Sequence, residues 1–284
     1  MGLAPSQKAL RFSAISQVVS KALDGLCCFS PDHPDWGVTE LASCLGLPKS
    51  TMHRLLITLE QYSFVQRTPL RRYRIGVRTL ELGNVFRYDR KFLVSAEPLL
   101  RTLAMKTQST AHLAQLEGRE VLELLRVSAP GAFTMSPFPI FRMPAHATAL
   151  GKVLLAWAGE DVFQQFVGLR KVLHRCTEHT IICPENLRSQ LDAVRELGYA
   201  RSDQESHTGQ VCLAVPVLSE KQVVVAALSV SGSVRQFRLQ DYPKILLELS
   251  STAKRISRCL RDTPCSADKR QRVRGERWSD IGAA

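Results

Sequence analysis

The sequence predicts an α+β protein with two domains, a small helical domain with a basic hairpin and a larger domain that mixes helices and strands. Three observations support this fold class. Short amphipathic helices and an arginine-rich hairpin fill roughly the first quarter of the 284 residues. A charged and polar run at 87–91 then interrupts a helical stretch. Two nearly continuous apolar segments, QVCLAVPVL and VVVAALSVSG, are typical of adjacent central strands.

The first helix is predicted from about Ala14 to Phe29, because apolar residues recur there at helical spacing. The following SPDHPDWG contains two prolines and a glycine and is predicted to be a loop. Thr39 is the expected N-cap of a second short helix, which Gly46 ends. The recurring apolar residues of the first helix are Ile15, Val18, Val19, Ala22, Leu23 and Leu26.

A third helix is predicted after a very short turn, in the stretch LGLPKSTMHRLL at residues 45–56. Two helices joined so tightly form a helix-turn-helix. Met52, Leu55, Leu56 and Leu59 are expected to pack inward, because they lie at i, i+3, i+4 and i+7. The polar groups opposite them can meet phosphates and base edges, although any surface helix has a polar side. The candidate DNA-binding residues are Lys49, Ser50, Thr51, His53 and Arg54, with Thr39 on the preceding helix.

The next segment, FVQRTPLRRYRIG at residues 64–76, predicts two short strands around a Thr68-Pro69 turn. A basic hairpin directly after a helix-turn-helix is typical of a wing that lies along the DNA backbone or the minor groove. The candidate DNA-binding residues of this wing are Arg67, Arg71 and Arg72. Helices and wing together favour DNA binding over a plain surface helix.

The charge distribution agrees with a polyanionic partner. The formal net charge is +12, and it is denser in residues 1–91 and in the last 19 residues than between them. No window approaches 18 consecutive apolar residues, and the N-terminus has no apolar core of signal-peptide type. We therefore expect a cytoplasmic protein without a membrane partner.

Eight cysteines occur without a Cys-x-x-Cys pair, which favours reduced thiols in a chain without a signal peptide. His174, Cys176, His179 and Cys183 could in principle ligate zinc. Their spacing fits neither a zinc finger nor a zinc ribbon, so the sequence favours scattered loop residues. We expect no metal site and no cofactor.

The remaining elements complete the mixed domain. The chain is predicted helical from Val77 to about Lys106 apart from the run at 87–91, and a hairpin turns at Glu117-Gly118. The last residues lack apolar periodicity and predict a disordered basic tail. Further helices are predicted from about Thr148, at Leu187 to Leu197 before Gly198, and at Leu239 to Leu260.

An enzyme and an adaptor are the competing classes of function. ALGK resembles the end of a phosphate loop but lacks the first glycine and the closing Ser or Thr, and the chain has no G-x-S-x-G, G-x-G-x-x-G or H-E-x-x-H motif. Cys212 with His207 could be imagined as a nucleophile and base, yet a mid-strand thiol in apolar surroundings is usually inert. The basic helix and wing argue against an adaptor that has lost DNA binding. The sequence therefore favours a DNA-binding protein that is not an enzyme.

Seven stretches, in this order and spacing, resemble the isocitrate lyase regulator (IclR) family of bacterial transcription regulators. They are TELASCLGLPKSTMHRLLITLE, YRIGVRTLELG, PAHATALGKVLLA, CTEHTI, LGYARSDQE, CLAVPV and VVVAALSVSG. The resemblance implies a winged helix-turn-helix domain, a linker helix that dimerises, and a GAF-like effector domain with an antiparallel sheet. It also implies a homodimer or a dimer of dimers that represses or activates a catabolic operon in response to a small carboxylic acid.

The resemblance divides the chain into ranges. Residues 1–13 are an N-terminal extension, 14–76 the winged domain, 77–95 the linker helix, 96–263 the effector domain and 264–284 the tail. The implied effector site combines backbone amides at a helix N-terminus, which suit a carboxylate, with nearby polar side chains. Its candidate residues are His146, Ala149, Leu150, Gly151, Ser202, Asp203, Glu205, Cys212, Ser229 and Ser231.

The chain departs from the family pattern in places. Ser202 stands where members often carry an acidic residue, for which Asp203 could substitute, and Ser63 stands where a glycine usually precedes the wing. The apolar loop from Gly131 to Pro144 could line an aromatic effector pocket, although packing between subunits is the favoured interpretation.

Overall fold

The computed structural model describes residues 16–89, 91–133, 142–168 and 172–261. The predicted extension, the tail and most of the loop from Gly131 to Pro144 therefore lie outside the described residues. Contacts divide the chain into two compact units, which meet between Asp89 and Arg90. Each unit is described by itself below.

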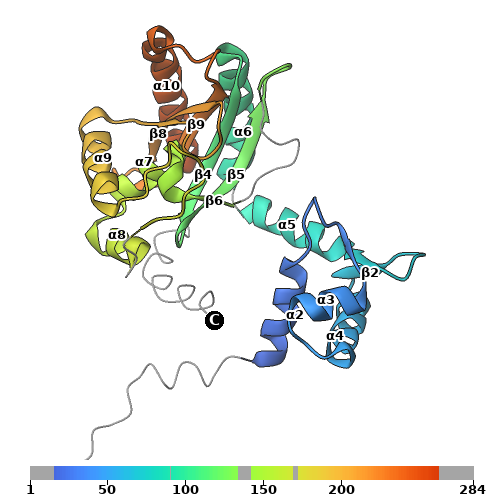
Figure 1. Ribbon diagram of the computed structural model, residues 1–284. Coiled ribbons are helices and arrows are strands. Elements are labelled where there is room, and N and C mark those ends of the chain that lie inside the picture. Colours follow the sequence, from blue (N-terminus) through green and yellow to red (C-terminus); the bar gives the residue numbers. More distant parts are fainter. Residues whose placement is uncertain (1–15, 90, 134–141, 169–171, 262–284) are drawn as a thin grey trace, which may run out of the picture. The chain divides into compact units, whose positions relative to one another are not determined.

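The first unit is a small helical domain with a short antiparallel sheet in the order β1-β3-β2 (Figure 1). Its core consists of Leu41, Ala42, Met52, Leu55, Leu56, Val65 and Tyr73, so the third predicted helix packs on the predicted side. The elements are α2 (Gln17–Cys27), β1 (Asp35–Trp36), α3 (Val38–Cys44), α4 (Lys49–Gln61), β2 (Val65–Arg67), β3 (Tyr73–Ile75) and α5 (Val77–Asp89).

Three local features of this unit differ from the sequence prediction. The N-cap of α3 is Gly37 and not Thr39, because the Glu40 carboxylate accepts from the Gly37 amide at 3.1 Å and so caps the helix one turn earlier. β1 forms inside the predicted loop, where Asp35 and Trp36 pair with β3. On α2, Val18 and Leu23 are more than half exposed, so its apolar stripe is only partly covered within the unit.

The turn from α4 into the wing uses the position where Ser63 replaces a glycine. Ser63 has a φ of 60°, a left-handed conformation that a serine adopts at some cost. Gly76 lies against it, since a Cβ added to Gly76 would stand 2.2 Å from the Ser63 carbonyl oxygen. A glycine is therefore required at Gly76, whereas at Ser63 the left-handed backbone is retained without one.

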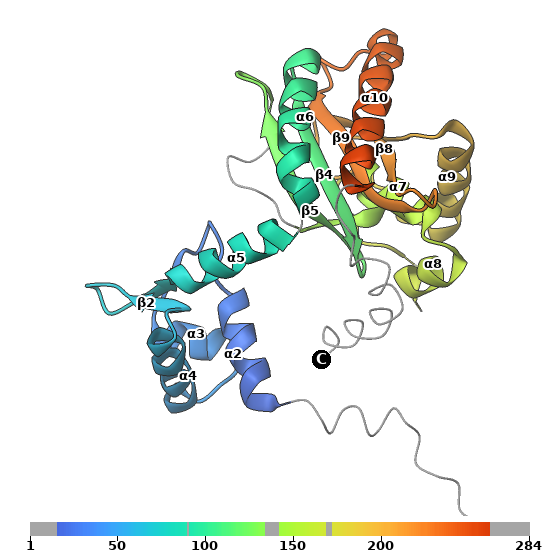
Figure 2. The same cartoon turned by 180° about the vertical axis from the view of Figure 1, so that it is seen from behind.

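The second unit is a three-layer sandwich around a six-stranded antiparallel sheet in the order β6-β5-β4-β9-β8-β7. Helices α6 and α10 cover one face and α7, α8 and α9 the other (Figures 1 and 2). The strands are β4 (Thr110–Glu117), β5 (Glu120–Ser128), β6 (Arg142–Pro144), β7 (Ala200–Asp203), β8 (Gln210–Leu218) and β9 (Val224–Ser233). The α-helices are α6 (Lys91–Thr107), α7 (Ala149–Trp157), α8 (Glu160–Val167), α9 (Pro184–Leu197) and α10 (Tyr242–Arg261), with short 3-10 turns at Ala145–Ala147 and Leu239–Asp241.

Most boundaries in this unit lie close to the predicted ones. The hairpin turns at Gly118, whose φ is +61°, and α9 ends at Gly198 in the left-handed conformation. The two apolar segments are the neighbouring strands β8 and β9. The predicted linker helix 77–95 is different, because α5 ends at Asp89 and a separate helix, α6, begins at Lys91 and buries Phe92 and Leu93 in the second unit.

Candidate nucleic-acid interface and ligand cavity

Helix α4 presents a polar surface because its apolar side is fixed in the core. Met52, Leu55 and Leu56 are each less than a tenth exposed, which orients the rest of the helix outward. Pro48 precedes the first turn and offers no side-chain cap to its amides. The exposed residues of the helix are Lys49, Ser50, His53 and Arg54, while Thr51 is half-buried. Cationic and hydroxyl groups therefore surround a helix N-terminus, as a phosphate contact requires.

The wing arginines have two different environments. Arg67 and Arg71 are exposed, whereas Arg72 turns back toward the domain. The Arg72 guanidinium donates to the Asp35 carboxylate and, at 2.8 Å, to Glu40. The hydrogen bonds from Arg72 and from the Gly37 amide lower the pKa of Glu40. Arg72 thus ties the wing to β1 and α3, a role that the run of arginines alone does not reveal.

Apolar side chains remain exposed on two helices of the same unit. On α2 these are Val18, Val19 and Leu23, each more than half exposed. On α5 they are Val77, Leu80, Leu82, Val85 and Phe86. Exposed apolar residues repeated along two helices are typical of a protein contact.

The second unit contains a cavity between the sheet and the N-terminus of α7. Its volume is about 30 Å³, enough for about two water-sized groups. Strands from the middle of the sheet and the α7 start contribute most of its lining. The lining residues are His112, Arg126, Met143, Thr148, Ala149, Leu150, Ser206, His207, Gln210, Cys212, Ser229 and Ser231.

The start of α7 is fixed by a cap and a close backbone contact. The Thr148 hydroxyl accepts from the Gly151 amide at 3.0 Å. Gly151 packs on the preceding turn, since an added Cβ would stand 2.1 Å from the Ala145 carbonyl oxygen. This arrangement places Ala149 and Leu150 at the cavity wall, with the positive end of the helix directed there.

A chain of three buried polar side chains crosses the sheet beside the cavity. His112 on β4 lies 2.5 Å from Glu123 on β5 through Nδ1, and 2.8 Å from the Ser231 hydroxyl on β9 through Nε2. Hydrolases join a serine, a histidine and a carboxylate in this way. Ser231, however, is a mid-ladder strand residue paired with Thr110 and Cys212 and not an exposed turn nucleophile. The chain of bonds is therefore suited to holding a ligand.

The other titratable groups that line the cavity stay neutral. Burial raises the pKa of the Cys212 thiol to about 12 and lowers the pKa of His207. A thiol with so high a pKa is a poor nucleophile at neutral pH. This environment gives no support to a Cys212–His207 nucleophile pair.

The structure brings five of the ten predicted effector residues to the cavity and five to a neighbouring polar network. Ala149, Leu150, Cys212, Ser229 and Ser231 line the cavity. The sequence reasoning did not select His112, Glu123 or Arg126. No local motif marks them, because they come together only through the β4–β5 register. His146, Gly151, Ser202, Asp203 and Glu205 are not among the lining residues.

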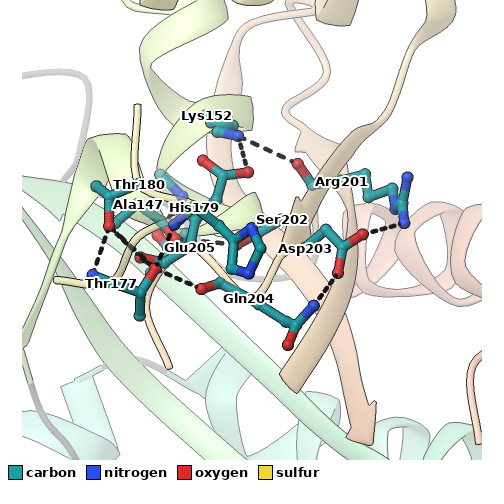
Figure 3. A network of polar contacts seen from close by, with 12 residues as sticks. Ala147, Lys152, Thr177, His179, Thr180, Arg201, Ser202, Asp203, Gln204 and Glu205 are labelled. Atoms are coloured by element: carbon teal, nitrogen blue, oxygen red, sulfur yellow. Dashed lines mark hydrogen bonds and ion pairs between the residues drawn. The ribbon is translucent and has the colours of Figure 1, made fainter. Parts of the chain in front are cut away.

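The neighbouring network holds the segment after β7 against α7 (Figure 3). Glu205 pairs with Lys152 at 2.5 Å, and Ser202 donates to the Ala147 carbonyl at 3.0 Å. Burial lowers the pKa of Lys152 and raises that of Glu205, against the attraction between the two groups. Asp203 instead pairs with Arg201. The structure gives these residues partners within the protein.

His146 and the cysteine-histidine segment also have structural partners. The His146 Nε2 lies 2.7 Å from the His174 carbonyl oxygen, and burial lowers the pKa of His146. Thr180, in the same segment, donates to the Glu205 carbonyl at 2.7 Å. Within the described residues, no three His, Cys, Asp or Glu side chains gather into a group that could hold a metal ion.

Comparisons with known proteins agree with this two-part organisation. The model of the bacterial transcriptional regulator IclR C-terminal domain matches residues 89–258, and that of the IclR helix-turn-helix domain matches residues 18–69. This chain belongs to the IclR family of transcriptional regulators. The HTH-type transcriptional regulator XynR of Escherichia coli is 32% identical over 87% of this chain and 98% of its own length. The transcriptional repressor IclR of Escherichia coli is 34% identical over 69% of this chain and 73% of its own length.

Solved structures show the same fold for this IclR-family regulator. An IclR homologue of Microbacterium hydrocarbonoxydans, complexed with 4-hydroxybenzoate, has a TM-score of 0.76 at 27% identity and covers 87% of this chain and 100% of its own. A putative IclR regulator of Silicibacter has a TM-score of 0.74 at 25% identity, covering 85% and 95%. The helix-turn-helix domain and the effector domain predicted from the sequence are confirmed.

Proposed function

We propose that this IclR-family regulator binds operator DNA through α4 and the wing, and that a small carboxylic acid bound in the second unit controls this binding. The observation that carries the DNA contact is the exposed set Lys49, Ser50, His53 and Arg54 around the N-terminus of a helix whose other side is buried. Phosphate contacts from such a helix position it in the major groove, and base contacts then specify the site.

A mobility-shift titration tests this proposal, using DNA from the promoter regions next to the chain's own gene. Arg54→Ala is expected to weaken binding, while Arg188→Ala, an exposed arginine of α9 paired with Glu160, serves as the matched control. Affinity should also fall steeply with salt, with a log-log slope of several units for about six or more phosphate contacts. A flat salt response would favour the adaptor alternative.

The proposed effector is a small carboxylate bound near the first turn of α7. Support comes from the position of Ala149 and Leu150 at the cavity wall, where helix amides favour an anion. The related Microbacterium structure holds 4-hydroxybenzoate, an aromatic carboxylic acid. A thermal-shift screen of aliphatic and aromatic carboxylates tests this part, because a bound ligand raises the melting temperature by mass action.

We further propose that the regulator acts as a homodimer or a dimer of dimers. The exposed apolar residues of α2 and α5 supply a surface that a second copy would cover. A homodimer suits a pseudo-palindromic operator, and an effector would act by shifting the equilibrium between arrangements of the two winged domains. Light scattering of the full chain, compared with Leu80→Glu on α5, tests the assembly.

The remaining parts of the proposal concern class and place. We propose a cytoplasmic regulator of a catabolic operon with no enzyme activity, no cofactor and no membrane partner. Relatives support the operon role, since they include the acetate operon repressor of Salmonella typhimurium and a glycerol operon regulatory protein of Streptomyces coelicolor. Among the described helices, none is both long and apolar enough to cross a membrane.

A further inference from the structure

One carboxylate beside the cavity faces two groups that can carry positive charge. Glu123 lies 2.5 Å from the His112 Nδ1 and 3.6 Å from the Arg126 Nε, measured from the same oxygen, Oε1. The Glu123 side chain is only 3% exposed, and its other oxygen, Oε2, has no hydrogen-bond partner among the described residues. Charge balance around this buried carboxylate is therefore central to the site.

Counting charges fixes the state of the empty cavity. Arg126 is always protonated and balances Glu123 by itself. If His112 were also protonated, the cavity wall would carry an uncompensated buried cation, which is costly. The other titratable lining groups, His207 and Cys212, are kept neutral by burial. Near neutral pH a neutral His112 thus completes a balanced set.

An anionic ligand changes this balance. A carboxylate in the cavity adds one negative charge, which a protonated His112 would compensate. Glu123 already holds the Nδ1 side, so the added proton would sit on Nε2, the side that contacts Ser231 and faces the lining. The second buried pair nearby, Lys152 with Glu205, is balanced within itself.

We propose that His112, positioned by Glu123, is a specificity-determining residue of the effector cavity, and that a short-chain monocarboxylate binds there together with one proton. This inference rests on the proposed effector function of the cavity and names the class of acid and the coupled proton. A second carboxylate on the ligand would exceed the available positive charge. The volume of about 30 Å³ also favours few non-hydrogen atoms.

Sign and size of the pH dependence follow from the coupling. The complex holds one proton more than its separate parts, so affinity rises as the pH falls. The dependence reaches about tenfold per pH unit where free His112 is neutral. A purely structural histidine would leave the affinity independent of pH in this range.

Calorimetry of the full chain tests the proposal with named probes, which are acetate, glycolate, lactate, benzoate, malonate and the neutral glycolamide. Titrations at pH 6.5, 7.5 and 8.5, in buffers of different ionisation enthalpy, measure the protons taken up. We expect uptake approaching one proton with at least one monocarboxylate at pH 8.5, and weaker binding of malonate and glycolamide. Absence of binding by all the monocarboxylates, or binding without proton uptake, overturns the proposal.

Variants separate recognition from folding. His112→Gln should abolish the pH dependence, whereas His179→Gln, an exposed histidine that does not line the cavity, should keep it. Glu123→Gln should bind the monocarboxylate at pH 8.5 at least as tightly as the parent and without proton uptake, because Arg126 is then uncompensated. A loss of binding in a folded Glu123→Gln variant contradicts the charge argument.

Mobility shifts on the same protein samples keep the two proposals apart. If the parent chain binds promoter DNA but no monocarboxylate with a proton, only this inference fails. If it takes up the proton with a monocarboxylate but binds no promoter DNA, the operator proposal fails and this inference stands. The two failures are therefore distinguishable.

Discussion

The winged domain and the effector domain place their candidate functional residues in opposite ways. On α4 the polar residues lie in one continuous stretch and are exposed, with a buried stripe behind them. In the second unit, the residues around the cavity come from five strands, α7 and a loop, and several are almost fully buried. A DNA surface can be built along one helix, whereas a cavity must be enclosed from several directions. This contrast decides how strongly each region should respond to substitution.

The largest expected effect is loss of the α4 support. Leu56→Ala removes a side chain that is 1% exposed in a small core, and should lower the free energy of unfolding of the first unit by about 2–5 kcal/mol. Operator binding should then disappear on mild heating while the second unit remains folded. Two melting transitions in calorimetry, with only the first one shifted, would bear this out. A single shifted transition would mean that the two units unfold together.

The next effect is direct loss of DNA contact. Arg54→Ala should reduce operator affinity by about 1–3 kcal/mol if Arg54 contacts a base edge, and should relax specificity at that position. Arg71→Ala, on the exposed side of the wing, should weaken all sequences similarly and reduce the salt slope by about one. Mobility shifts over a salt series measure both quantities. Unchanged affinity in both variants would contradict the assigned surface.

Arg72 distinguishes a structural wing arginine from a DNA-binding one. Arg72→Ala should lower stability by up to about 1 kcal/mol, because the ion pairs with Asp35 and Glu40 are partly exposed. Glu40 has a pKa lowered below 4.5, so the stability from this pair is present above that pH and is lost as the pH falls through the lowered value. Acid unfolding of the parent and of Glu40→Gln, followed by circular dichroism, checks the sign. The variant should show the weaker dependence.

The smallest effect concerns cysteine chemistry in the two regions. Cys212, with a pKa of about 12, should react with iodoacetamide at pH 8 more than about tenfold slower than the exposed Cys27 and Cys44. Mass spectrometry of timed digests measures the rates at each residue. A bound carboxylate should leave the exposed cysteines unaffected. Rapid modification of Cys212 in the folded chain would show that the cavity wall opens.

Local sequence determined the features that depend on neighbouring residues. The 3.6-residue periodicity of Met52, Leu55 and Leu56 set which side of α4 is buried, and Gly198 ended α9, because both effects act within a few residues. The seven family stretches also determined the order of the domains. Elements of this kind are confirmed almost residue by residue.

Tertiary structure decided which groups meet. Asp35 and Glu40 bind Arg72 more than thirty residues away and turn it from the DNA surface, and the strand register joins His112 to Glu123 and Ser231. Glu205 and Ser202 acquired partners in the protein, which no spacing rule could anticipate. Strand pairing links positions that are remote along the chain. The sequence therefore determined the classes of site, and only the fold decided which side chains face the cavity.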